Sequence, residues 1–576
     1  MTALATAPAA GVDKQKKQVP GRSTRSSRVL LALVLLVILA LIGWPLWGVF
    51  RYALSVEGWS VVTSFFTTRT NRRLLLNTMQ LGISVALLTT ALAFVLAFAQ
   101  ARMQFLGRRF IHILTLLPIV SPPFAVAAAT ITLFGRSGMI TQGVFGYRLD
   151  IYGFWGLLFV LTLSYLPLAY MNLLGMLRAL DPAHEEAAFS LGANRLRILR
   201  TVTLPMLVPG FAGAFLLVFV ETISDLSNPL VLGGDFQVLA SRAYLAIIGE
   251  YNLPGGAAYS MVLLLPAVAL FLLQRYWAER ASTVSVSGKP TGRHVAITTP
   301  WLKIPALIVA YSVALMVLLI YGAILLGGFV RILGVNNTFT LNNYRYIFTG
   351  VGNDAIIDTT ILALIATPVA GLLGVFVAWL VVTRLQRTAG AVDFLGMLGM
   401  ALPGTVVGIG YLIVYNSSTT LFGLPLIPAL AGGGAVFGGA IAIIMVFVAG
   451  SSPVGQRNGI SALRQIDPSL EEASISLGQS EAGTFRRITM PLLRPALLAG
   501  LTYAFARSMT SVSAVIFLTT PSQRILTSQI YAEVDRGRFG NAFAFCTILI
   551  IIVLLAMLVI HLITRRMEGA RQWQAV

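Results

Sequence analysis

Two charged residues within apolar stretches are the strongest candidates for chemistry in this sequence. Glu221 lies in the run GFAGAFLLVFVETIS, and Arg507 lies in the run GLTYAFARSMT. Ionisable groups at membrane depth are costly and are by default candidates for a substrate or ion pathway. The two residues are equivalent, because each follows a proline (Pro205 or Pro491) by the same number of residues. We expect them to pair as a gate; the alternative is a salt bridge that only fixes helix packing.

Three polar residues near this pair are further candidates for the pathway. Asp225 lies one helical turn past Glu221, which would place both carboxylates on one face of a continuous helix. Asn228 follows Asp225, and Ser511 is the equivalent of Asp225 in the second stretch. In one interpretation these side chains contact a substrate, and in the other they are packed or solvated polar groups.

A polar segment that occurs twice is the second notable feature. HEEAAFSLGANRLRILRTVTLP begins at His184, and LEEASISLGQSEAGTFRRITMP begins at Leu470. The preceding aspartates, Asp181 and Asp467, are each followed by proline and are suited to cap a short helix, whose dipole the glutamates complement. A glycine then permits a sharp turn into a second, basic helix, and the last proline marks re-entry into the membrane. The repeated positions are Glu185, Glu186, Ala187, Gly192 and Pro205 in the first copy, and Glu471, Glu472, Ala473, Gly478 and Pro491 in the second.

Residues for metal binding or catalysis show no grouping. The four histidines, His112, His184, His294 and His561, are scattered, so we expect no histidine metal site. Cys546 is the sole cysteine, which excludes a disulfide within the chain and a cysteine metal site. Whether the pathway binds a metal stays open.

A nucleotide-binding loop is also missing from the sequence. The Gly-rich stretches GLPLIPALAGGGAVFGGA and VLGGDF lack the lysine of a phosphate-binding loop. We expect them to form close helix packing or a loop. The chain is therefore not predicted to be an enzyme that hydrolyses ATP, or to hold a cofactor of its own.

The composition indicates a membrane protein surrounded by lipid. Of 576 residues, 57% are hydrophobic and 11% are charged, whereas soluble domains typically carry about 25% charged residues. The net charge of +20 does not indicate a nucleic-acid partner, because the basic residues lie in short loops between apolar runs rather than on one soluble face.

Twelve apolar runs have the length of about 20 residues that a bilayer requires. Prolines in LLPIVSPPF and MALPGTVVG are expected to kink the third run of each half. The first run has a basic lead-in but is too long for a signal peptide. The expected spans are 29–50, 74–101, 110–135, 152–177, 203–232, 256–278, 304–330, 355–383, 394–416, 425–450, 491–519 and 540–564.

The distribution of positive charge predicts which side of the membrane each loop and terminus faces. With the N-terminus in the cytoplasm, inner segments hold more than twice as many of the 41 Lys and Arg residues as outer segments. Cytoplasmic loops carry such an excess. Both termini and both repeated segments are therefore expected on the cytoplasmic side.

The repeat divides the chain into two halves of six spans each. A shorter and weaker match between the halves pairs Asn77-Thr78 with Asp358-Thr359. Because six is even, both halves insert the same way up, which predicts a pseudo-twofold axis along the membrane normal. The expected organisation is an inner basic tail (1–28), a first half (29–278) with loop 181–205, a linker (279–302), a second half (303–564) with loop 467–491, and an inner tail (565–576).

At these residues the sequence resembles the permeases of binding-protein-dependent ABC importers. Their signature is Glu-Ala-Ala, three residues, Gly, nine residues, and a segment ending in Leu-Pro. The first half has Glu186-Ala187-Ala188, Gly192 and a segment ending at Pro205, and the second has the same spacing from Glu472 to Pro491, with Ser for the second Ala and Met for Leu. The resemblance covers essentially the whole chain and implies an all-α, polytopic fold like that of type I importers in a bacterial inner membrane.

The resemblance also implies partners. Each repeated loop would be a coupling loop that docks on one of two copies of an ABC ATPase, which would bind ATP and Mg, and a soluble binding protein would deliver substrate from outside. The fused halves are most similar to ferric-iron permeases; phosphonate, phosphorylated-sugar and thiamine permeases share the layout. An ion-coupled secondary transporter of six plus six spans is the alternative from another class, and a structural scaffold is a third.

Overall fold

The fold is described from a computed structural model that covers residues 25–281, 299–385, 388–421 and 424–574. Most of the expected N-terminal tail and linker, together with His294, lies outside these ranges. The chain is a multi-span helical protein, in agreement with the expected fold class, with two small antiparallel hairpins in addition: β1 (Val330–Ile332) with β2 (Asn336–Phe339), and β3 (Thr419–Leu421) with β4 (Leu424–Ile427).

The first half consists of helices throughout its described length. Its elements are α1 (Arg25–Ile38), η1 (Leu39–Gly43), α2 (Trp44–Ala53), α3 (Val56–Thr67), α4 (Arg69–Arg102), α5 (Arg108–Leu116), η2 (Leu117–Val120), α6 (Pro123–Phe134), α7 (Phe154–Ala179), α8 (Pro182–Ser190), α9 (Arg195–Ile198), η3 (Leu199–Thr203), α10 (Leu204–Ser224), α11 (Ser227–Leu232), α12 (Leu239–Tyr244), η4 (Leu245–Gly249) and α13 (Leu253–Ala281).

The second half repeats the same order of long and short helices. Its helical elements are α14 (Pro300–Gly327), α15 (Asn342–Phe348), α16 (Val351–Trp379), η6 (Leu380–Arg384), α17 (Ala389–Ala401), α18 (Gly404–Tyr415), η7 (Val436–Gly439), α19 (Ala440–Leu463), α20 (Pro468–Ser476), α21 (Glu481–Thr484), η8 (Phe485–Thr489), α22 (Met490–Thr510), η9 (Val515–Phe517), α23 (Leu526–Asp535) and α24 (Phe539–Gln574).

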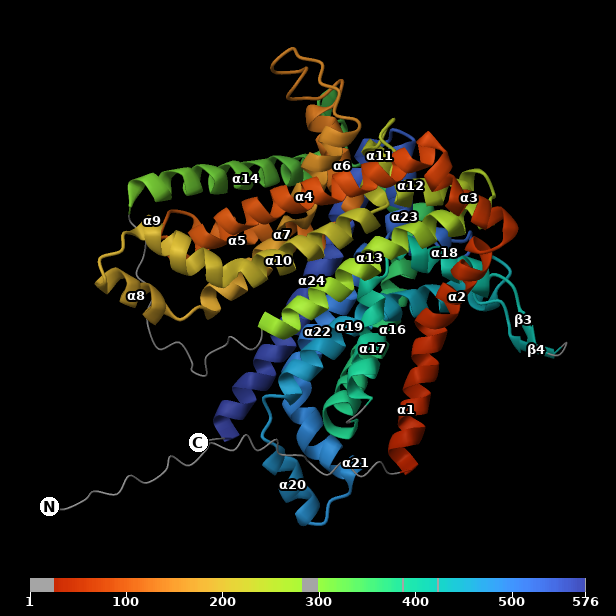
Figure 1. Ribbon diagram of the computed structural model, residues 1–576. Coiled ribbons are helices and arrows are strands. Elements are labelled where there is room, and N and C mark those ends of the chain that lie inside the picture. The colour runs from red at the N-terminus through yellow and green to blue at the C-terminus, as the bar shows by residue number, and fades with distance from the viewer. Residues whose placement is uncertain (1–24, 282–298, 386–387, 422–423, 575–576) are drawn as a thin grey trace.

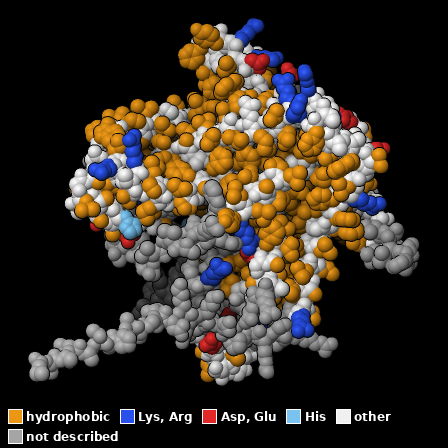
Figure 2. All heavy atoms as spheres, viewed as in Figure 1, with side chains coloured by type: hydrophobic (Ala, Val, Ile, Leu, Met, Phe, Trp, Pro, Cys, Tyr) orange, Lys and Arg blue, Asp and Glu red, His pale blue; other side chains and the backbone are white. Residues whose placement is uncertain are grey.

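The number of membrane-crossing helices agrees with the expected twelve only if broken helices are counted. Ten described helices are long and apolar enough to cross a bilayer, and two bent helix pairs bring the number to as many as 12. The pairs fall at the predicted proline sites, and α17 and α18 meet at 98° around Pro403. Proline lacks an amide hydrogen and disfavours helix in the residue before it. Figure 2 shows hydrophobic side chains over most of the helical body, with charged side chains near its ends.

One expected span has wrong boundaries. The expected span 425–450 begins only at Ala440, because β4 and a loop precede it, and the helix continues to Leu463. Pro425 and Pro428 cannot donate helical hydrogen bonds, and Gly432 and Gly439 adopt left-handed φ angles of 88° and 94°. The long Gly-rich stretch is thus a hairpin and loop, and not a helix-packing surface. The last expected span, 540–564, agrees with the crossing segment Phe539–Thr564, and α24 continues beyond it to Gln574.

The first helix of each half packs against the other half (Figure 1). The Tyr411 and Tyr415 hydroxyls on α18 donate to the carbonyls of Leu41 (2.8 Å) and Ala40 (2.7 Å) in η1. A π turn leaves carbonyls that need such donors. Reciprocally, α14 of the second half packs on α4, α5 and α6, and the Tyr311 hydroxyl donates to Leu106 O (2.8 Å).

Close helix packing in the second half depends on glycines of α16 and α19. A methyl group at Gly374 would lie 2.5 Å from the carbonyl oxygen of Ser452 and 2.7 Å from the Gln456 nitrogen. The Cα of Gly374 lies 3.6 Å from the position of a Cβ on Gly455, on the facing helix. Small residues allow membrane helices to approach in this way.

We predict that Gly374→Ala destabilises the protein, because the methyl group meets backbone atoms that cannot rotate away. Overpacking of this kind costs about 1–3 kcal/mol and should lower the thermal unfolding midpoint in detergent. Gly322→Ala is the matched control, since nothing lies within 4 Å of the added methyl group. Equal midpoints for the two variants would contradict this packing.

Candidate functional site

The two repeated loops, residues 181–205 and 467–491, begin with the same local structure. Asp181 Oδ1 accepts a hydrogen bond from the Ala183 amide (3.0 Å) at the start of α8. Asp467 Oδ1 accepts from the Ser469 amide (3.0 Å) at the start of α20. A proline occupies the first turn of both helices, where its missing amide hydrogen has no cost. The predicted capped helices are confirmed.

A glycine reverses the chain after each short helix. Gly192 has a φ of 83° and Gly478 a φ of 84°, a conformation that costs glycine little. The predicted basic helix is not separate in either half, because Arg195–Ser224 and Phe485–Thr510 are each one continuous helix that contains the basic residues. Pro205 therefore lies inside a helix, and the π turn η3 directly before it accommodates the missing amide hydrogen. The turn η8 does the same before Pro491.

The glutamates of each pair point in different directions. Glu186 and Glu472 are exposed, as are Ala187 and Ala473. Their neighbours point inward: Glu185 Oε1 accepts from the Thr203 hydroxyl (3.1 Å), and Glu471 Oε1 accepts from the Thr489 hydroxyl (2.6 Å). In Figure 1 the two short helices project from the helical body at separate places, α8 at the left and α20 at the bottom.

Each repeated loop also exposes apolar side chains at equivalent positions, which the sequence analysis did not single out. Leu191 is 88% exposed and its equivalent Leu477 is 84% exposed. Phe189 and its equivalent Ile475 are exposed beside them. Together with the exposed glutamates, they form a small apolar and acidic tip on each loop, suited to fit a pocket of a partner protein.

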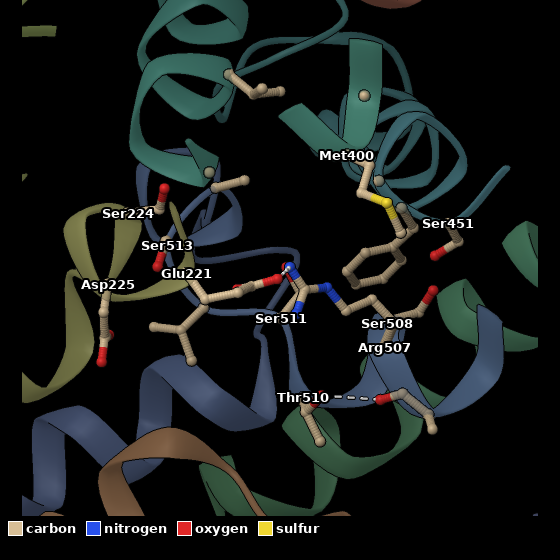
Figure 3. A pocket seen from close by; sticks show the side chains of 18 of the residues that line it. Glu221, Ser224, Asp225, Met400, Ser451, Arg507, Ser508, Thr510, Ser511 and Ser513 are labelled. Atoms are coloured by element: carbon tan, nitrogen blue, oxygen red, sulfur yellow. Dashed lines mark hydrogen bonds and ion pairs between the residues drawn. The ribbon is translucent and has the colours of Figure 1, made fainter. Parts of the chain in front are cut away.

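Glu221 and Arg507 face one another across the interface of the halves. The Arg507 Nη2 atom of α22 lies 3.6 Å from Glu221 Oε1 of α10. The Arg507 side chain is 48% exposed and the Glu221 side chain 21% exposed, because both border an internal cavity. Figure 3 shows the Glu221 carboxylate and the Arg507 guanidinium pointing toward each other.

The cavity around this pair has a volume of about 220 Å³ and many hydroxyl groups. Two of these, Ser451 and Ser508, are buried and have no hydrogen-bond partner among the described residues. Buried polar groups normally find partners, so unpaired hydroxyls beside a cavity indicate a site for water or a polar ligand. The hydroxyl-bearing lining residues are Ser121, Ser164, Tyr165, Ser224, Ser451, Tyr503, Ser508, Thr510, Ser511 and Ser513.

The structure corrects the expected position of Asp225. The α10 helix ends at Ser224, so Asp225 does not share a helical face with Glu221. Asp225 is 4% exposed and its Oδ1 accepts from the Ser227 amide (2.8 Å), while its other oxygen accepts from the Asn228 side chain. This local bonding starts α11. Ser511, the equivalent residue, similarly follows the end of α22 at Thr510.

The threonines of the shorter match, Thr78 and Thr359, have a structural role in the N-terminal third of α4 and α16. The Thr78 hydroxyl accepts from the Leu239 amide at the start of α12 (2.9 Å). The Thr359 hydroxyl accepts from the Leu526 amide at the start of α23 (2.7 Å). Each threonine thus fixes a short helix to a membrane-crossing helix.

Metal-binding groups do not gather in the part of the chain that the structure describes. No cluster of three His, Cys, Asp or Glu side chains occurs there. His112 instead contacts the Tyr170 hydroxyl through Nδ1 at 2.6 Å.

Comparisons with known proteins give one consistent family. Residues 89–283 and 353–569 match the family of binding-protein-dependent transport system inner membrane components. The ferric transport system permease protein FbpB of Actinobacillus pleuropneumoniae is 35% identical over 483 residues, which cover 82% of this chain and 67% of that protein. The putative ferric transport system permease protein FbpB 1 of Haemophilus influenzae is 36% identical, with coverages of 77% and 68%. A probable sulfate transport system permease protein of Helicosporidium is 26% identical over 40% of this chain and 86% of its own.

We predict different outcomes for two substitutions at Asp225. Asp225→Ala leaves the Ser227 amide and the Asn228 side chain without their acceptor, which costs about 1–3 kcal/mol and lowers the thermal unfolding midpoint. Asp225→Asn keeps a capping acceptor and should unfold and transport like the wild type. Ser511→Ala is the control and should have little effect. Loss of transport in a stable Asp225→Asn protein would instead indicate that the carboxylate contacts substrate.

Proposed function

The chain belongs to the family of binding-protein-dependent transport system inner membrane components, and we propose that it forms the translocation pathway of an ATP-driven importer of ferric iron. Membership of this family makes the chain a non-catalytic, multi-span permease of an ABC importer. Such permeases work with an ATPase and a binding protein. The observation that carries the proposal is the pair of coupling loops with the same capped helix, glycine turn and exposed tip.

We propose that each coupling loop docks on one copy of a separate ATPase, which binds ATP and Mg. The exposed Glu186 and Glu472, with Leu191 and Leu477 beside them, suit this role because apolar anchors in a partner's pocket carry most of the energy of an interface. Ala187 and Ala473 are exposed on the same helices and allow close approach.

The arrangement in the membrane follows from the duplication and from the distribution of charge. We propose that the halves 29–278 and 303–564 are related by a pseudo-twofold axis along the membrane normal. The excess of Lys and Arg supports a cytoplasmic location for both termini, the linker and both coupling loops. A soluble binding protein delivers substrate at the opposite face, beside α12 and α23.

We propose that Glu221 and Arg507 form a gate within the pathway. Their 3.6 Å separation closes the interface between α10 and α22, and the hydroxyl-lined cavity lies beside the pair. ATP-driven movement of the coupling loops separates the halves and thus the pair. Ser511 and Asp225 both border the cavity. Asp225 also accepts a hydrogen bond from Asn228, and the two residues position the nearby α11.

Ferric iron is preferred as the substrate because relatives that cover most of the chain carry that name. Two such relatives match 82% and 77% of this chain, whereas the sulfate permease relative matches 40%. An ion-coupled carrier would have no use for two matching coupling loops. Uptake of ferric iron, compared with phosphonate, phosphorylated sugar, thiamine and sulfate, by vesicles that contain this chain with its ATPase and binding protein tests the substrate.

We predict that Leu191→Asp combined with Leu477→Asp prevents assembly with the ATPase. A charge in each apolar contact should cost about 2 kcal/mol per site, and the co-purified ATPase should fall accordingly. Leu106→Asp is the control, because Leu106 is 89% exposed in another loop on the same side. Normal assembly and ATP-dependent transport by the double variant would rule out docking through these tips.

We predict that charge reversal at the gate is rescued by a second reversal. Glu221→Arg and Arg507→Glu each place two like charges together, and we expect each to lower transport at least about tenfold. The double variant restores opposite charges and should recover most of the activity. Transport by the double variant no better than by either single variant would show that direct pairing is unimportant.

A further inference from the structure

Arg102, at the end of α4, makes a buried ion pair with the first coupling loop. Its Nη2 atom donates to Glu185 Oε1 at 2.9 Å, and the two side chains are 2% and 18% exposed. The same carboxylate oxygen accepts from Thr203 at the start of the fifth membrane helix. Glu185 thus joins the coupling helix α8 to two membrane-crossing segments at once.

This ion pair is costly for the protein to keep. Arg102 Nε and Nη1 have no hydrogen-bond partner in the described parts of the chain. Burial of a guanidinium with unpaired donors costs free energy that a single contact does not recover. A surface coupling loop could be attached more cheaply by apolar packing, so the position of this arginine requires a reason other than stability.

The opposite end of α4 supplies that reason. In the N-terminal third of this helix, the Asn77 side chain donates to Gln237 O (3.0 Å) and the Thr78 hydroxyl accepts from the Leu239 amide (2.9 Å). Arg102 lies 24 residues after Thr78 in the same helix, which corresponds to about 36 Å. One rigid helix therefore connects the coupling helix α8 with α12 on the far face of the protein (Figure 1).

The second half repeats this arrangement only in part. At its far end, Thr359 holds the start of α23 as Thr78 holds α12. At the coupling end, the Trp379 ring of α16 lies 4.9 Å from the Phe485 ring of η8. Glu471, the equivalent of Glu185, is held by Thr489 and has no ion pair with any described residue. An ion pair therefore joins α4 directly to the coupling helix in the first half, whereas in the second half an aromatic contact joins α16 to the turn η8 near the end of the coupling loop.

We propose that Arg102 is a positioning residue that transmits motion: through Glu185 it ties the first coupling helix to α4, so that displacement of α8 by the ATPase moves α12 at the opposite face. This role rests on the proposed importer function. Because Glu471 has no ion pair, loss of its carboxylate should disturb coupling less than loss of the Glu185 carboxylate.

The test uses the full chain reconstituted with its ATPase and an iron-loaded binding protein. Ferric iron transported per ATP hydrolysed is measured for Arg102→Met, Glu185→Gln and the double variant. We expect each single variant to lower this ratio about tenfold and the double variant to be no worse than either. Arg102→Lys should recover part of the ratio, and the matched control Glu471→Gln should change it less than twofold.

Amide hydrogen exchange on the permease chain alone separates attachment from folding. We expect Arg102→Met to speed exchange across residues 182–204 while exchange in α7 and α19 stays as in the wild type. Thr78→Val should lower the iron-to-ATP ratio without changing exchange in 182–204, because it removes only the hydrogen bond between α4 and α12.

Three results would overturn the role of Arg102. The first is an unchanged iron-to-ATP ratio in Arg102→Met, and the second is a loss of this ratio in Glu471→Gln as large as that in Glu185→Gln. The third is an Arg102→Met chain that no longer binds the ATPase, because the ion pair would then be part of the docking surface. A wild-type complex without ATP-driven iron uptake would instead refute the proposed function, while the exchange measurement would still show whether Arg102 holds α8.

Discussion

A membrane interior offers no water to a polar group, so every charge and amide within it must find its partner inside the protein. This constraint explains why the spans are helices, in which the backbone pairs with itself. It also explains where the helices break. Pro403 removes an amide hydrogen between α17 and α18, and the break lies beside the cavity that Glu221 and Arg507 also border. Glu221 and Arg507, which cannot be solvated by lipid, meet each other at that cavity.

The same constraint acts differently on the two halves, although they share one pattern. Fusion into one chain allows equivalent positions to hold complementary rather than identical residues. Glu221 is thus opposite its equivalent Arg507, an arrangement that two identical subunits would replace with two like charges. Glu185 likewise has Arg102 as a partner, whereas Glu471 is held by a hydroxyl. The two halves therefore share one architecture but differ in their side-chain contacts, so their movements need not be symmetric.

Much of the fold could be predicted because its determinants are local. Apolar length predicted the spans, proline predicted the breaks, and Asp181 and Asp467 cap their helices as their sequence context indicates. The failures also have local causes. The run from 425 is apolar enough for a span, but its prolines and glycines favour a hairpin and loop. Asp225 fits a helical spacing from Glu221, but its own side chain ends that helix by bonding to the next amides.

By itself, the sequence determined that the chain is a membrane protein with a repeated, capped short helix in each half, because hydrophobic length and capping depend on neighbours within a few residues. Only the tertiary structure decided which charges meet. The pairing of Arg102 with Glu185, and the exposure of Glu186 beside it, depend on how helices far apart in the chain are rotated and packed. The unpaired hydroxyls of Ser451 and Ser508 at the cavity are a further case. The sequence alone does not show whether a serine in an apolar helix lines a cavity, because this depends on how the helices pack.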